Sequence, residues 1–298
     1  MVANEISPTS VSESTTKVSE FRRIIRVLIG RKLTLFGLII ILITVIAAIF
    51  APLLAPYDPY QPDLKSTLLQ PNSQHWLGTD PLGRDTLSRM LYGARTSLIV
   101  GLAAVGIAAL VGMTLGLLAG YFGDIPYMVI MRLNDALMAF PMMLLALAMA
   151  ALLGGGLKNV VMAIGASLVA SYTRLMCGQV LSVKSSDYIL AERSIGASHR
   201  RIMLSHIVPN CLPPLIVLIT LMTGAAILSE AGLSFLGVGI MPPAASWGGM
   251  VSDGYPFVVT FPLLSFIPGV AIMLIVFSFN MVGDGLRDAL DPMLRGTL

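Results

Sequence analysis

Long uncharged apolar blocks constrain this chain more than any other feature of its sequence. The plainest ones are residues 33–54, 96–122, 136–157, 207–229 and the later part of 254–283. A bilayer core about 30 Å thick is crossed by about 20 apolar residues in an α-helix, so each block can span it. A shorter apolar block, residues 160–172, counts as a sixth span. The sequence therefore predicts an all-α integral membrane protein with about six transmembrane helices.

Composition excludes a water-soluble fold for a chain of this length. Hydrophobic residues make up 56% and charged residues only 12% of the sequence, against about a quarter charged in an ordinary soluble domain. The net charge is +3, but the basic residues lie at the ends of the apolar blocks rather than in a stripe, which argues against nucleic acid as a partner. The expected surroundings are the lipid bilayer.

The basic residues also predict an orientation. Most of them fall on the side of the N-terminus, whereas Lys65, Arg84, Arg89, Arg95 and Lys158 fall on the other. Because basic residues are enriched on the cytoplasmic side, both termini are expected to be cytoplasmic. We therefore expect a disordered cytoplasmic tail over residues 1–30, a first transmembrane helix with an extracytoplasmic loop over 31–94, and a five-helix core over 95–298.

One polar segment between apolar blocks is too hydrophilic to span the membrane. Asp187 can cap a short helix that begins at Tyr188, and Ala191 and Ile195 lie four residues apart on one face of it. Gly196 lets the chain leave the helix sharply. This segment suits docking into a groove on another protein, although an ordinary amphipathic connection between membrane helices has the same pattern.

The spacing of Gly196 and Pro209, thirteen residues apart, resembles the cytoplasmic signature of ABC-importer permeases. In that family the segment is the coupling helix, which enters a cleft on the ATPase subunit. Leu190, Glu192 and His206 depart from the general pattern, which has Glu, Ala and Ile there. The resemblance assigns the coupling helix, at about residues 187–198, and its signature to Asp187, Tyr188, Leu190, Ala191, Glu192, Arg193, Gly196, Ala197 and Pro209.

Further blocks resemble the dipeptide, oligopeptide and nickel permeases, and the C-type subunit among them. These blocks are HWLGTD at residues 75–80, GYFG at 120–123, LSFLG at 233–237 and GDGLRDALDP at 283–292. The resemblance implies the type I ABC importer permease fold and alternating access in the cytoplasmic (inner) membrane of a bacterium. Di- or oligopeptides are the favoured substrates, and nickel or a metal chelate is the alternative.

The resemblance also implies partner subunits. In agreement with this, the chain has none of the sequence motifs that hydrolyse ATP. It has no GxxxxGK[ST] loop to cradle phosphates, no HExxH and no GxSxG. We expect no catalytic residue, metal or cofactor in this chain, and ATP and Mg²⁺ on two separate ABC ATPase subunits. A homologous second permease subunit and an extracytoplasmic substrate-binding protein complete the expected importer. A self-sufficient secondary transporter is the competing class, but it would usually show repeated halves and charges deep in the bilayer.

Several other residues inside the apolar blocks point to packing or to the transport pathway. Gly112, Gly116 and Gly120 line one helix face, for static packing or for a sliding surface. Glu230 could line the pathway, meet a substrate amine or bond to a structural partner. Three residues apart, Arg132 and Asp135 are expected to pair with each other. The two cysteines, at 177 and 211, are interpreted as packing residues.

Overall fold

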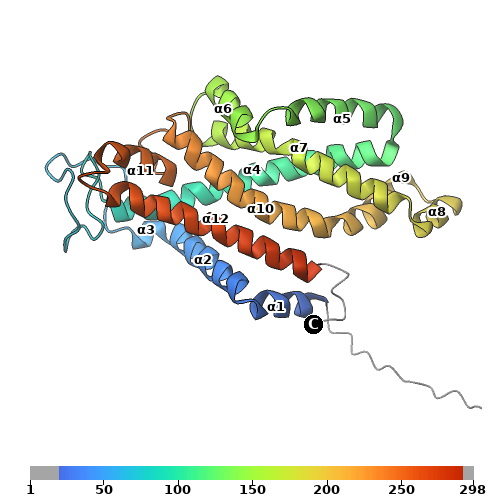
Figure 1. The fold of residues 1–298 in the computed structure, drawn as a ribbon, viewed down its shortest axis with the longest axis horizontal. Coiled ribbons are helices and arrows are strands. Elements are labelled where there is room, and N and C mark those ends of the chain that lie inside the picture. The colour runs from blue at the N-terminus through green and yellow to red at the C-terminus, as the bar shows by residue number, and fades with distance from the viewer. Residues whose placement is uncertain (1–19, 291–298) are drawn as a thin grey trace, which may run out of the picture.

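The computed structural model describes residues 20–290, and over these residues the chain is almost entirely helical (Figure 1). The elements in chain order are α1 (Glu20–Gly30), α2 (Lys32–Ile49), α3 (Ala51–Leu54), α4 (Thr86–Phe122), α5 (Asp124–Met138), α6 (Met142–Leu153), α7 (Leu157–Lys184), α8 (Asp187–Ser194), α9 (His199–Arg201), the π-helical turn η1 (Ile202–Ile207), α10 (Val208–Phe235), α11 (Trp247–Gly254), the 3-10 turn η2 (Tyr255–Phe257) and α12 (Leu263–Leu290).

Five helical segments of the described chain are long and apolar enough to cross a membrane: α2, α4, α7, the run from α9 to α10, and α12. The pair α5 and α6 makes a sixth if the two are taken as one bent span. The prediction of an all-α protein with about six spans is thus confirmed. The short span expected at residues 160–172 is part of the 28-residue helix α7.

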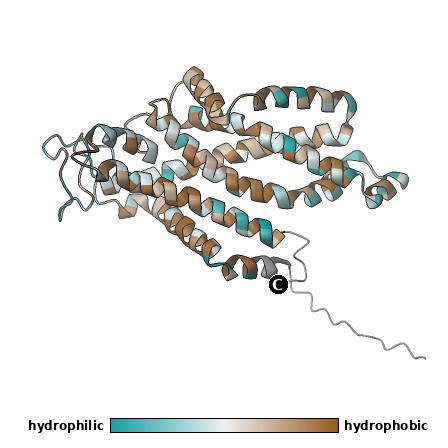
Figure 2. Cartoon of the chain, in the orientation of Figure 1, coloured by the Kyte–Doolittle hydropathy of each residue, from teal (hydrophilic) through white to brown (hydrophobic). Residues whose placement is uncertain are grey.

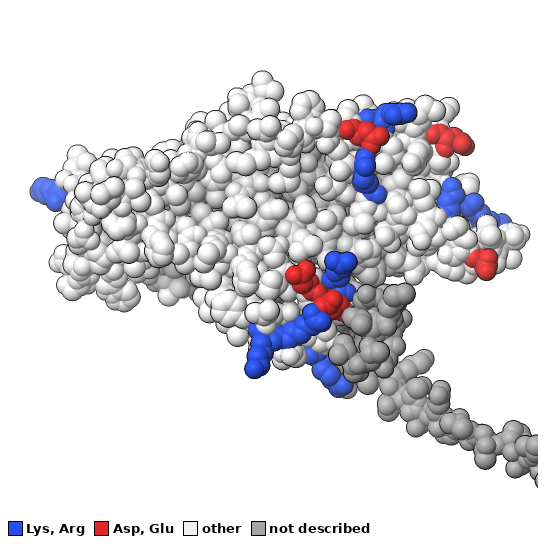
Figure 3. Space-filling view, in the orientation of Figure 1, with Lys and Arg blue, Asp and Glu red and all other residues white. Residues whose placement is uncertain are grey.

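The long helices lie roughly side by side, and the connections gather at the two ends of the bundle (Figure 1). We call one end the loop end, where residues 55–85 and α11 lie, and the other the α8 end, where α8 and α9 lie. Hydrophobic residues cover the lengths of the helices (Figure 2). On the face seen in Figure 3, charged residues are concentrated in the half nearer the α8 end. Long stretches of helix without charged side chains are what the hydrocarbon of a bilayer requires, since charges there are costly.

The third span differs from its prediction. The block at residues 136–157 was expected to cross the membrane as one span, but the chain there belongs to two helices, α5 and α6, which meet at an angle of 91°. Pro141 is the N-cap of α6 and has extended backbone. A proline has no N–H to continue the helical hydrogen bonds, and it disfavours a helical conformation in the residue before it. The chain therefore breaks here and starts a new helix in another direction.

Two boundaries of the predicted domains also need correction. The tail was expected to be disordered through residue 30, but residues 20–30 form α1; residues 1–19 lie outside the described part of the chain. The boundary between residues 94 and 95 falls inside α4, which begins at Thr86. Asp85 caps that helix by accepting a hydrogen bond from the Ser88 N–H at 2.8 Å. The helix therefore starts a full ten residues before the apolar block does.

The helix pair with the most extensive contact is α4 with α7, and glycines make the close approach possible. A Cβ atom built on Gly112 would lie 2.6 Å from the carbonyl oxygen of Val169, and one on Gly116 would lie 2.5 Å from that of Thr173. On Gly120 it would lie 2.8 Å from the Cβ atom of Val180. The glycine face of α4 therefore lies directly on the backbone of α7, as in small-residue packing of membrane helices.

The GDGLRDALDP motif, at residues 283–292, holds α2 and α10 against α12. A Cβ atom on Gly285 would lie 2.5 Å from the side chain of Thr34 on α2, and one on Gly283 would lie 2.6 Å from Leu221 on α10. Asp288 forms an ion pair with Arg31 at the start of α2. The last two residues of the motif, Asp291 and Pro292, lie outside the described part of the chain.

Candidate functional site

The segment with the coupling-helix pattern forms α8, which projects from the end of the bundle (Figure 1). Ile189 is completely buried and packs in the same core as Ile202, Ile207 and Val180. Tyr188 and Leu190 are about half exposed, whereas Ile195, just after the helix, is 77% exposed. One buried residue thus anchors α8 to the bundle, while the other large apolar side chains of the segment stay uncovered.

The start of α8 corrects one prediction. Asp187 was expected to be the capping residue, but Ser186 occupies the N-cap and Asp187 is the first residue of the helix. Neither side chain caps the helix by a hydrogen bond. In the first turn, the carboxylate of Asp187 still interacts favourably with the positive end of the helix dipole.

The end of α8 depends on Gly196. Its φ of 80° lies in the left-handed region that glycine adopts without a steric penalty. The N–H of Gly196 donates to the carbonyl of Arg193, and the N–H of Ala197 donates to the carbonyl of Glu192, both at 3.0 Å. These two bonds form a Schellman motif, which satisfies the last carbonyls of the helix and turns the chain back toward α9.

Two of the three departures from the family pattern face each other. The Oε1 atom of Glu192 lies 3.6 Å from the Nε2 atom of His206 in η1, and both side chains are largely covered. A carboxylate and a histidine at this distance attract each other when the histidine is protonated. The two residues stand fourteen positions apart on different elements, so their pairing has no local signal in the sequence.

The GYFG block supports α8 from the end of α4, a role that the sequence did not indicate. The Lys184 Nζ donates to the carbonyl of Tyr121 at 2.6 Å. The Arg193 guanidinium lies 5.5 Å from the centre of the Tyr121 ring, within cation–π range. The phenol oxygen of Tyr121 is also 2.7 Å from Nδ1 of His199. One tyrosine thus joins α4 to α7, α8 and α9.

Pro209 of the signature lies in the first turn of α10, directly after the π-helical turn η1. Since a proline has no N–H, it cannot close the α-helical bond back to residue 205. The next residue, Asn210, adds two hydrogen bonds at this point. Its side-chain amide donates to the carbonyl of His206 at 2.6 Å and to the hydroxyl of Tyr188 at 3.2 Å. This amide joins α8 to α10.

Glu230 lies near the loop-end terminus of α10 and is fully buried. Its carboxylate accepts hydrogen bonds from Ser234 Oγ at 2.7 Å and from Ser97 Oγ on α4 at 3.1 Å. Ser234 Oγ in turn accepts from the Ile240 N–H at 3.0 Å. Within the described chain, Glu230 therefore has structural partners and joins α4, α10 and the segment that follows α10.

A network of charges, most of them buried, organises the loop end around residues 79–85, TDPLGRD. Asp80 accepts from Arg84 Nε at 2.6 Å and lies 3.4 Å from Arg89 Nε, and both arginines reach Asp253 on α11. Burial raises the pKa of Asp253, although the charges of Arg89 and Arg84 oppose the shift. The network fixes residues 55–85 and α11 to the start of α4.

The expected pairing of Arg132 with Asp135 is wrong. Asp135 on α5 forms its ion pair with Arg174 on α7. Residues three apart on a helix can pair, but Arg174 faces Asp135 across the space between two helices, and the pair joins them.

Cys177 and Cys211 are buried free thiols, as the packing interpretation required. Among the described residues, no group of three or more His, Cys, Asp or Glu side chains is placed to hold a metal ion.

The fold and this site define the chain as a multi-pass membrane protein with a short helix that projects from one end of the bundle. A family model described as "binding-protein-dependent transport system inner membrane component" matches residues 112–296, and one for the "N-terminal TM domain of oligopeptide transport permease C" matches residues 19–71. The chain belongs to this family of ABC-importer permease subunits.

Named relatives cover almost the whole chain. It is 45% identical over 280 residues to the dipeptide transport system permease protein DppC of Alkalihalophilus pseudofirmus, covering 94% of this chain and 92% of the relative. It is 39% identical over 293 residues to the oligopeptide transport system permease protein OppC of Bacillus subtilis, covering 98% and 94%. A structure of the MetNI methionine ABC transporter in inward-facing conformations matches with a TM-score of 0.55 at 17% identity, over 68% of this chain and 96% of that one. The likeness to that structure confirms the predicted type I permease fold.

Proposed function

We propose that this chain is the C-type permease subunit of an importer for di- or oligopeptides. The observation that carries the proposal is its identity of 45% over 94% of its length with a permease named for dipeptide transport. The oligopeptide permease of Bacillus subtilis is similar over nearly the whole chain as well. These relatives favour peptides over the alternative substrates, nickel or a metal chelate.

The partners and their arrangement are part of the proposal. The chain pairs with a homologous second permease subunit in the inner membrane of a bacterium, and an extracytoplasmic binding protein delivers the substrate. Two ABC ATPase subunits hold ATP and Mg²⁺, and α8 docks in a cleft on one of them. The exposed side chains of Tyr188, Leu190 and Ile195 support this docking, because apolar residues at a bundle end gain most from a protein partner.

Peptide uptake by the reconstituted importer tests the function. Proteoliposomes with both permease subunits and both ATPases, supplied with ATP inside and with loaded binding protein outside, are expected to accumulate a labelled dipeptide or longer peptide. The permease subunit alone should hydrolyse no ATP, since it has no phosphate-binding loop. Uptake of nickel but of no peptide would refute the proposed substrate.

The orientation has its own test, for which the structure offers two exposed serines at opposite ends of the bundle. Ser73 lies in the loop-end connection and Ser185 between α7 and α8. With both termini in the cytoplasm, Ser73→Cys should react with an impermeant thiol reagent added to intact cells. The Ser185→Cys variant should react only after the cells are opened. Reaction of both variants in intact cells would contradict the orientation, and each variant controls for the expression of the other.

A further inference from the structure

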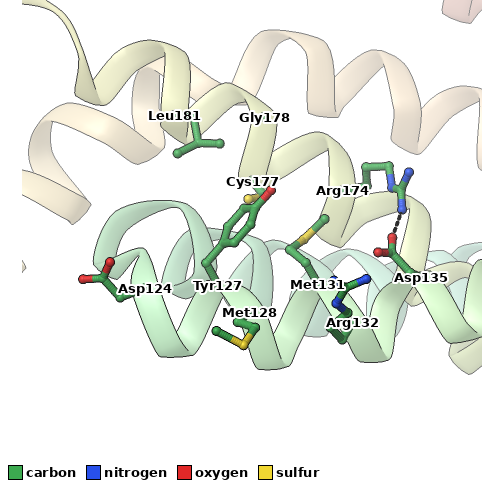
Figure 4. Close-up of a pocket in the computed structure, with 10 residues that line it drawn as sticks. All are labelled: Asp124, Tyr127, Met128, Met131, Arg132, Asp135, Arg174, Cys177, Gly178 and Leu181. Carbon is green, nitrogen blue, oxygen red and sulfur yellow. Dashed lines mark hydrogen bonds and ion pairs between the residues drawn. The ribbon is translucent and has the colours of Figure 1, made fainter.

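A groove of about 650 Å³ with charged residues in its lining runs between α5 and α7 (Figure 4), and α5 lies in the half of the bundle nearer the α8 end (Figure 1). Its size falls within the range of small-molecule sites, about 300–1,000 Å³. Four charged residues line it together with three flexible or aromatic ones on α5 and three small or apolar ones on α7. The lining residues are Asp124, Tyr127, Met128, Met131, Arg132, Asp135, Arg174, Cys177, Gly178 and Leu181.

One charge of this groove, Arg174, lies well inside the membrane-spanning helix α7, and the other three are on α5. Arg174 is ten residues before the last residue of α7, which corresponds to about 15 Å along the helix axis. Ionisable groups at such a depth are costly, and they usually mark a pathway or a partner. Arg174 is paired with Asp135, but Arg132 forms no ion pair with any carboxylate of residues 20–290. The groove therefore offers one positive charge that the described chain leaves uncompensated.

The charges are also ordered along the groove. Asp124 lies toward one end of it, and Arg132 with the Asp135–Arg174 pair lies toward the other (Figure 4). Asp124 and Arg132 are eight residues apart on α5, or about 12 Å along the axis. An extended chain covers about 3.3–3.6 Å per residue, so this separation suits a peptide of about three or four residues.

The side chains between the two charged ends suit a ligand of variable shape. Met128 and Met131 lie between Asp124 and Arg132 on α5, and Tyr127 lies beside them (Figure 4). Methionine has three rotatable bonds and a polarisable sulfur, and it is common on surfaces that accept many partners. A phospholipid headgroup with both charges would fit less well, since a two-carbon link joins its phosphate and its ammonium group.

We propose that this groove is a binding station for the peptide in transit, in which Arg132 pairs with the terminal carboxylate of the peptide and Asp124 with its terminal ammonium group. The inference rests on the proposed function, because it takes the substrate to be a peptide. In the predicted orientation the groove belongs to the cytoplasmic half of the bundle, so the peptide would occupy it shortly before release. The Asp135–Arg174 ion pair joins α5 to α7 beside the groove.

Protection of an introduced cysteine tests the station directly. In the purified importer without binding protein, Met128→Cys presents an exposed thiol in the groove, whereas the native Cys177 is almost fully buried. A tripeptide with free termini should slow alkylation of this thiol. The same peptide amidated at its C-terminus should protect about tenfold less well, as expected for the loss of one charge-assisted hydrogen bond. Adding Arg132→Gln should reduce protection by the free peptide to the level of the amidated one.

Uptake measurements separate this proposal from the proposed function. With binding protein saturated by peptide, Arg132→Gln should slow uptake about tenfold, Arg132→Lys should retain much of it, and the matched control Arg95→Gln, at the loop end, should behave as the wild type. Protection as strong by inorganic phosphate as by peptide, equal protection by free and amidated peptide, or dissociation of the two permease subunits by Arg132→Gln would each overturn the station. If the wild type took up no peptide at all, the proposed function itself would fail.

Discussion

Gly116→Leu is expected to leave almost no folded, membrane-inserted protein. A Cβ atom at this position would lie 2.5 Å from the carbonyl oxygen of Thr173, 2.7 Å from the Cβ atom of Met176 and 2.9 Å from the backbone nitrogen of Cys177. Backbone atoms cannot rotate away as the end of a side chain can, so α4 and α7 would have to separate. Overpacking of a core costs about 1–3 kcal/mol in typical cases, and four added carbons against backbone should exceed that range. Because the whole free energy of unfolding of a protein is about 5–15 kcal/mol, a cost of this size should remove most of the folded protein.

The same helix provides a matched control for this substitution. A Cβ atom on Gly106 would meet nothing within 4 Å, and the residue is exposed. Alanine is favoured over glycine inside a helix by about 1 kcal/mol. Gly106→Ala should therefore keep or raise the midpoint of thermal unfolding, whereas Gly116→Ala should lower it. Size-exclusion chromatography of a fluorescent fusion measures the folded fraction for all three variants. A normal peak for Gly116→Leu would show that α4 and α7 do not pack as described.

The sequence predicted the apolar architecture well, because the requirement for about 20 apolar residues per span is independent of neighbouring helices. The blocks at residues 33–54, 96–122 and 207–229 correspond to α2–α3, α4 and α10. The break of the third span into two helices was not predicted, since the apolar run continues past Pro141 and hydropathy alone does not give the angle of 91° at which they meet. The helical start of α4 was missed too, because its first residues are polar, and one of them, Arg89, is held by ion pairs with Asp80 and Asp253.

The candidate site was predictable only in its local features. Gly196 was expected to end α8, and its positive φ and the two Schellman hydrogen bonds depend on residues within five positions of it. The contacts that fix α8 to the bundle could not be read from the sequence, since they join distant elements: Tyr121 of α4 with Arg193, and Glu192 with His206. The pairing of Arg132 with Asp135 failed for the same reason. Helical spacing favoured the local partner, but α7 brought Arg174 to the same carboxylate.

Gly196→Val is expected to reduce peptide uptake at least about tenfold while leaving the protein folded and inserted. The left-handed conformation at Gly196 costs about 1–2 kcal/mol for an L-residue, and a β-branched side chain is especially unfavourable there. The strain can be relieved only by unwinding the last turn of α8 or by changing the course of residues 195–198. Either change moves the surface proposed to dock in the ATPase. A difference of 1.4 kcal/mol in the population of the productive conformation is a factor of ten.

Space and backbone strain can be separated at this position, because a Cβ atom on Gly196 would meet nothing within 4 Å. Gly196→Asn adds a side chain of similar size but tolerates the left-handed region, where asparagine often replaces glycine after a helix. Uptake should therefore fall in the order glycine, asparagine, valine, with asparagine close to the wild type. Substrate capture by the separate binding protein should be the same for all three, and so should the amount of permease in the membrane. Equal loss with asparagine and valine would mean that the docking surface requires open space at Gly196, and wild-type uptake with valine would mean that α8 does not transmit the motion of the ATPase.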